Sequence, residues 1–136
     1  MANKNKPTEQ KTVDRYLDLF YMTPSEVSAK DIASLLQDTK GMRIELWEEM
    51  NVLELELHNQ NTVDFEPVET VFTDPSDAAF IKNRNIKTIY AISLKELDLP
   101  AVKPYFEQMI EKFSGFVCAD TADFNPVYAG SNTKKS

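Results

Sequence analysis

Alternating hydrophobicity between residues 42 and 66 constrains the fold of this chain more than any other feature. Apolar and polar side chains alternate over three short segments, 42–47, 53–58 and 63–66. Strict alternation is typical of strands that place one face on a core and the other in water. The segments 48–51 and 59–61 between them contain turn-forming asparagines. The sequence therefore predicts an antiparallel meander of three strands.

The region before the meander has helical spacing. Apolar side chains three and four positions apart predict an amphipathic helix over 8–22. Ser28, with Asp31 three positions later, is typical of a helix start, and Gly41 is expected to end that second helix. Two helices are thus expected ahead of the first strand.

After the meander, helix and strand signals alternate. An Asp-Pro pair opens a short helix over 74–85, and a nearly continuous apolar run predicts a central strand over 87–93. A long helix is expected over 100–113, with Pro104 as an alternative start. Residues 116–119 are a candidate for one more short strand.

Together these elements predict one α+β domain. The length of 136 residues fits a single domain, which we place at residues 8–130, with disordered tails at 1–7 and 131–136. The expected order is α-α-β-β-β-α-β-α-(β), a mostly antiparallel sheet with its helices packed on one face.

Charge favours a basic protein as the partner. The net charge is −7, and residues 42–79 hold ten acids against Arg43 alone. Such a chain repels phosphate backbones, so we expect no nucleic-acid partner. Three glycines and the absence of nucleotide-binding motifs give no reason to expect a cofactor.

The candidate site is the outer face of the predicted meander. If the leucines point inward, carboxylates fill the opposite face, with one tryptophan and one histidine at its margins. The alternative is an ordinary solvated face, and flat strands suit a divalent cation poorly. The expected site residues are Glu45, Trp47, Glu54, Glu56, His58, Asp64 and Glu66.

Trp47 and Cys118 each have two interpretations. Trp47 is either an exposed interface anchor or, as is commoner, packed under a helix edge. Cys118, the single cysteine, could act as a nucleophile with His58 and Asp120 or Asp123, but its apolar neighbours favour a buried small side chain. One histidine and one cysteine in distant segments do not make a metal site.

Residues 27–36 resemble the first helix of helix-turn-helix DNA-binding domains, but the resemblance fails where the recognition helix would follow. The lone cysteine and the lack of a long apolar segment favour a cytoplasmic protein with no membrane span. We therefore expect a small binding or regulatory protein without enzymatic activity. The alternatives are a structural or oligomeric domain and an enzyme that uses a carboxylate pair on the outer face.

Overall fold

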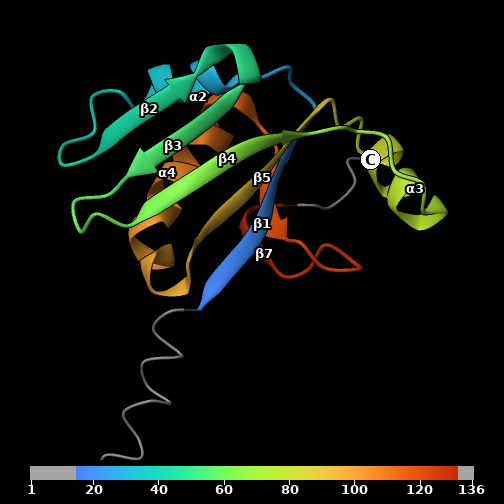
Figure 1. The fold of residues 1–136 in the computed structure, drawn as a ribbon. Helices are drawn as coiled ribbons and strands as arrows, with labels where there is room; N and C mark the ends of the chain where they lie inside the picture. Colours follow the sequence, from blue (N-terminus) through green and yellow to red (C-terminus); the bar gives the residue numbers. More distant parts are fainter. Residues whose placement is uncertain (1–14, 132–136) are drawn as a thin grey trace, which may run out of the picture.

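The computed structural model describes residues 15–131 and contains one antiparallel sheet of seven strands in the order β2-β3-β4-β5-β1-β6-β7 (Figure 1). The strands are β1 (Tyr16–Thr23), β2 (Arg43–Trp47), β3 (Val52–Glu56), β4 (Thr62–Val68), β5 (Thr88–Lys95), β6 (Phe116–Ala119) and β7 (Val127–Gly130). The helices are α2 (Ala29–Leu36), α3 (Pro75–Asn83) and α4 (Leu99–Phe113), with short 3-10 turns η2 (Glu48–Met50) and η3 (Glu96–Asp98).

The meander β2-β3-β4 has the predicted register. Leu46, Leu53 and Phe65 lie opposite one another on the inner side, and Leu53, Leu55, Val63 and Phe65 are fully buried. Glu54 and Glu56 therefore point away from the core, as the alternation predicts.

The predicted helix over 8–22 is wrong for its described part, because Tyr16–Thr23 forms strand β1. Leu19 and Tyr21 contribute to one hydrophobic cluster, and Phe20 and Met22 contribute to another. Both sides of β1 are thus buried from Leu19 onward, and a buried strand of this kind is a nearly continuous apolar run whose spacing can resemble that of a helix. The described chain therefore begins with a strand, not with two helices.

Helix α2 begins as the sequence predicts but ends earlier. The Ser28 hydroxyl accepts a hydrogen bond from the Asp31 backbone N–H, and the Asp31 carboxylate accepts one from the Ser28 N–H. This reciprocal capping box satisfies two backbone donors that a helix start leaves free. The helix ends at Leu36, and Gly41, at φ 76°, lies in the turn before β2 instead.

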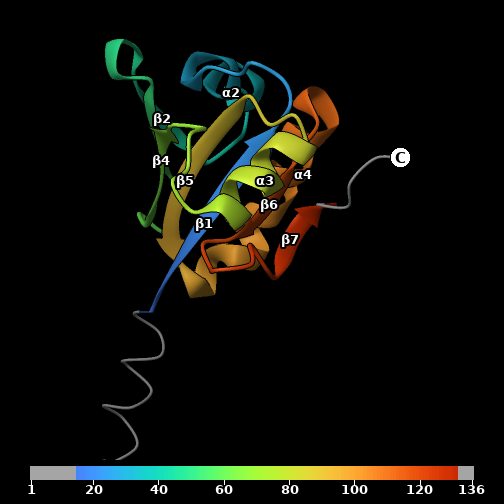
Figure 2. The same ribbon diagram turned by 90° about the vertical axis from the view of Figure 1, so that its right-hand side faces the viewer.

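The helices cover both faces of the sheet, which corrects the expectation of one face. Residues of α2 and α4 pack with the inner side chains of the strands, whereas Ile81 of α3 packs with Phe20 and Ile89 on the opposite side. Figure 2 shows α3 in front of β1 and β6, with α4 beyond them. In Figure 1, α2 and α4 lie behind β2, β3 and β4, and no helix lies in front of those strands.

The later elements follow the prediction with two corrections. Asp74 caps α3 by accepting from the backbone N–H groups of Ser76 and Asp77, with Pro75 at the first helical position. Helix α4 starts at Leu99, so Pro104 lies inside it, in the second turn. The strand at Phe116–Ala119 is confirmed, and β7 pairs beside it as a strand that the sequence did not predict.

The proposed tails at 1–7 and 131–136 lie outside the described residues, apart from Ser131. Among residues 15–131, no helix is both long and apolar enough to span a membrane.

Candidate docking face

The outer face, meaning the side of the sheet opposite α2 and α4, carries acidic side chains in register. Glu45 of β2 lies opposite Glu54 of β3, and Glu54 lies opposite Asp64 of β4. Directly opposed side chains on neighbouring strands have Cβ atoms about 4.5–5.5 Å apart. Three carboxylates therefore stand side by side across the meander.

This line continues as far as β6, with Ser93 in place of a carboxylate on β5. Asp64 lies opposite Ser93 of β5, and Ser93 lies opposite Asp18 of β1. The backbone N–H of Asp120, just after β6, donates to the Asp18 carbonyl oxygen at 3.0 Å. We call Glu45, Glu54, Asp64, Asp18 and Asp120 the acidic row. At about 4.8 Å per strand, its length is about 24 Å.

The carboxylates of the acidic row destabilise one another's charged forms. Desolvation raises the pKa of Glu54, with further contributions from Asp64 and from the charge of Glu56. At the other end of the row, desolvation and then the charge of Asp18 raise the pKa of Asp120. Like charges directly opposed across strands destabilise a sheet, so this arrangement lowers the stability of the free protein.

Two cations of the outer face, Arg43 and Lys95, lie on one side of the acidic row, near Glu56. Arg43 Nη1 lies 3.1 Å from Glu56 Oε1, and the Arg43 side chain is 82% exposed. Lys95 follows two positions after Ser93 on the same side of β5, opposite Tyr16. An exposed ion pair contributes at most about 1 kcal/mol, so Arg43 offsets little of the repulsion along the acidic row.

Trp47 and Glu66 border the acidic row on its other side. Trp47 lies opposite Val52, at the end of β2, and is 40% exposed, so the interpretation that it packs under a helix edge is wrong. Glu66 is exposed on β4, two positions beyond Asp64. An exposed tryptophan beside a line of carboxylates combines an apolar anchor with charge.

The catalytic constellation considered from the sequence does not form. Cys118 lies fully buried on β6 in the cluster under α3, whereas His58 is exposed just beyond the end of β3, beside Gly41. Four strand spacings, about 19 Å, separate β3 from β6. Of the predicted site residues, His58 is the one that lies beyond the strands, where it lines a cavity of about 50 Å³ with the buried Asp98.

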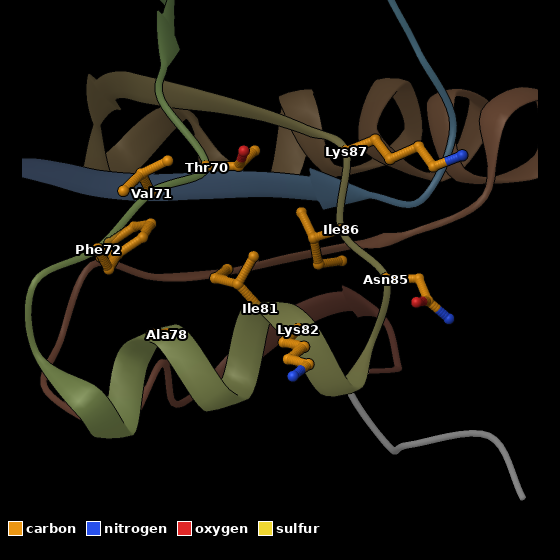
Figure 3. Close-up of a pocket in the computed structure, with 9 residues that line it drawn as sticks. All are labelled: Thr70, Val71, Phe72, Ala78, Ile81, Lys82, Asn85, Ile86 and Lys87. Carbon is orange, nitrogen blue, oxygen red and sulfur yellow. The ribbon is translucent and has the colours of Figure 1, made fainter.

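None of three cavities among the described residues is lined by the acidic row. Figure 3 shows one of about 410 Å³ between α3 and the segment that joins β4 to it, lined by Val71, Phe72, Ile81 and Ile86 among others. A second, of about 570 Å³, lies between the start of α2 and the start of β5. Within residues 15–131, no three histidine, cysteine or acidic side chains converge as metal ligands.

Sequence reasoning missed Asp18 and Asp120 as members of the acidic row. The helical spacing over 8–22 places Asp18 in a helix, and Asp120 is considered only as a neighbour of Cys118. The available signal was alternation in Leu17-Asp18-Leu19, which has the period of a strand.

A scan against protein-family models matches no family, and searches of curated proteins and of solved structures also find no match.

Proposed function

We propose that this protein binds a basic protein through its outer face, with the acidic row as the charged contact and Trp47 as an apolar anchor. The observation that carries the proposal is the register of Glu45, Glu54 and Asp64 side by side on a strand face with no helix over β2, β3 or β4. A merely solvated face can mix both signs without loss, whereas this one keeps mutually repelling carboxylates in register.

A strand face with no helix over β2, β3 or β4 suits docking better than catalysis. Catalytic carboxylates work in concave sites that exclude water, and the described cavities lie away from the acidic row. A basic surface laid on the outer face would relieve the repulsion at Glu54, so part of the strain in the free protein would become binding free energy. We further propose a cytoplasmic location, on the basis of the single cysteine.

The test is a capture experiment with a charge-reversed protein and a matched control. Glu54→Lys, Glu56→Lys and Asp64→Lys together reverse the centre of the outer face. Glu107→Lys, Glu111→Lys and Asp38→Lys reverse three exposed acids elsewhere and change the net charge equally. We expect wild type and control to recover the same basic proteins from native extract, and the outer-face variant to lose them.

Salt and Trp47 supply two further measurements on any partner recovered. Association should slow as salt rises, because screening removes long-range steering beyond about 8–10 Å. Trp47→Ala should weaken binding by about 2 kcal/mol if the ring is an anchor. Equal recovery of partners by wild type, the control and the outer-face variant at low and high salt would show that the face is only solvated.

A further inference from the structure

The free edge of the sheet at β2 has features of its own, separate from the acidic row. Within residues 15–131, β2 pairs with β3 alone, and no loop backbone hydrogen-bonds to its outer edge. Met42, Ile44 and Leu46 on its inner side are only half-buried, whereas the equivalent residues of β3 and β4 are fully buried. An exposed edge with apolar side chains along it is a template for another strand.

The outer side of β2 carries charges of both signs, Arg43 and Glu45. A strand that bears an acid and a base two positions apart can be its own complement when it pairs antiparallel with a second copy. The other edge strand, β7, has the sequence Val-Tyr-Ala-Gly and carries no charge. Of the two edge strands, β2 alone carries charges that can pair with those of a second copy of the same strand.

We propose that β2 pairs antiparallel with β2 of a second copy of this chain, about a two-fold axis that passes between the two Ile44 residues. This register places Arg43 opposite Glu45 of the second copy, twice by symmetry. On the inner side, it places Ile44 opposite Ile44 and Met42 opposite Leu46. The two seven-stranded sheets become one continuous sheet.

The neighbouring registers are unfavourable. Centring the axis on Glu45 opposes the two Glu45 side chains, and centring it on Arg43 opposes the two arginines. Like charges directly opposed across strands are destabilising, so charge selects the Ile44-centred pairing. In that pairing Arg43 stands between Glu56 of its own chain, at 3.1 Å, and Glu45 of the second copy.

The same register brings Trp47 opposite Gly41 of the second copy, where there is no side chain to obstruct the ring. Trp47 is the single tryptophan of the sequence and is 40% exposed in the free chain. Its emission therefore reports directly on this pairing. The inference does not depend on the proposed function, because it rests on the free edge of β2. The pairing engages Glu45 and Trp47 and leaves Glu54, Asp64 and Glu66 of each outer face open.

The test is the association state of the full-length protein, measured by sedimentation and by Trp47 emission against protein concentration at physiological salt. We expect wild type to form dimers with a blue shift of Trp47 emission. Arg43→Glu and Glu45→Arg should each weaken the dimer by about tenfold or more, because two attractive pairs become repulsive. The double variant Arg43→Glu with Glu45→Arg restores opposite charges and should restore the dimer.

Circular dichroism and thermal unfolding would establish that each variant is folded, and restoration by the double variant separates pairing from misfolding. A wild type that stays monomeric at high concentration overturns the proposal. So does a dimer that persists in both single variants, which would place the interface elsewhere. Single variants that are monomeric with a double variant that stays monomeric would also reject this register.

Discussion

At the scale of single residues, Cys118 has the environment of a structural side chain. It is fully buried in the cluster with Phe20 and Phe124, and burial, followed by the nearby charge of Asp120, raises the pKa of its thiol to about 12. A thiol with such a pKa is almost wholly protonated at neutral pH, and the thiolate is the reactive form.

We therefore expect Cys118 to resist thiol reagents in the native protein and to label rapidly once denaturant unfolds it. Cys118→Ala should lower the free energy of unfolding by roughly 1 kcal/mol and leave any binding intact. The rate of Cys118 labelling is followed by the absorbance of the group that the thiol reagent releases, with unfolded protein as the control. Native labelling as fast as that control would contradict the burial.

Asp98 is a buried carboxylate with a structural role. Its two oxygens accept hydrogen bonds from the side-chain amides of Asn59 at 2.9 Å and Asn61 at 2.8 Å, and the residue is 3% exposed. Burying a charge is costly unless its acceptors are satisfied, and here both are. Asp98 thereby ties the turn between β3 and β4 to the start of α4, which holds one end of the meander in place.

At the scale of elements, the junction of α4 with β6 depends on Gly115. The hydroxyls of Thr23 and Ser25 both donate to the Phe113 carbonyl oxygen at 2.8 Å, which closes the end of α4 against β1. Gly115 follows at φ 96°, and a Cβ there would collide with the Met22 carbonyl oxygen and with Thr23. Because Gly115 has no side chain, α4 can turn directly into a strand beside β1.

Gly115→Ala should therefore lower the free energy of unfolding by roughly 2–4 kcal/mol, through backbone strain and overpacking together. Gly41→Ala is the matched control, because Gly41 also has a positive φ but a Cβ there would meet only His58, at 3.5 Å. The control should lose only about 1–2 kcal/mol. Urea unfolding of both variants measures the difference, and equal losses would show that the collision at Gly115 is relieved.

The sequence predicted the elements whose formation depends on residues that are close together in the chain. The meander, the capping of α2 by Ser28 and the start of α3 at Asp74 each rest on neighbours within a few residues. Strand β1 was missed because its partners are distant, and its buried run, Leu19–Met22, mimics a helical stripe. The division of helices between two faces, and with it the part of the acidic row at Asp18 and Asp120, depends on strand order, which the chain's periodicity does not encode.

At the scale of the whole molecule, the charge distribution couples stability to pH. Because the pKa of Glu54 is raised by folding, the folded state binds that proton more tightly than the unfolded state does. This contribution therefore increases stability as the pH falls from neutral through the raised pKa. Glu96, whose pKa is lowered through its bond with Arg15, acts in the opposite direction at lower pH.

Asp64→Asn should raise the thermal midpoint near neutral pH, because it removes one source of the raised pKa of Glu54. The gain should shrink at mildly acidic pH, where Glu54 of the wild type is increasingly protonated. Asp38→Asn, at an exposed position outside the acidic row, makes the same change in net charge. Thermal unfolding of both variants at the two pH values is the measurement, and an equal effect of both would trace the gain to net charge alone.

The central position of β1 also affects how the chain is made. Its two neighbours are β5 and β6, so Leu19 pairs with Ile92 and Ala119, which follow it by 73 and 100 residues. Residues that pair among β2, β3 and β4 are only 5 to 13 positions apart. On the ribosome, the meander can close early while β1, apolar on both sides, has emerged first and still lacks a partner. The interval between synthesis of β1 and release of β6 is thus when the nascent chain most needs protection from aggregation.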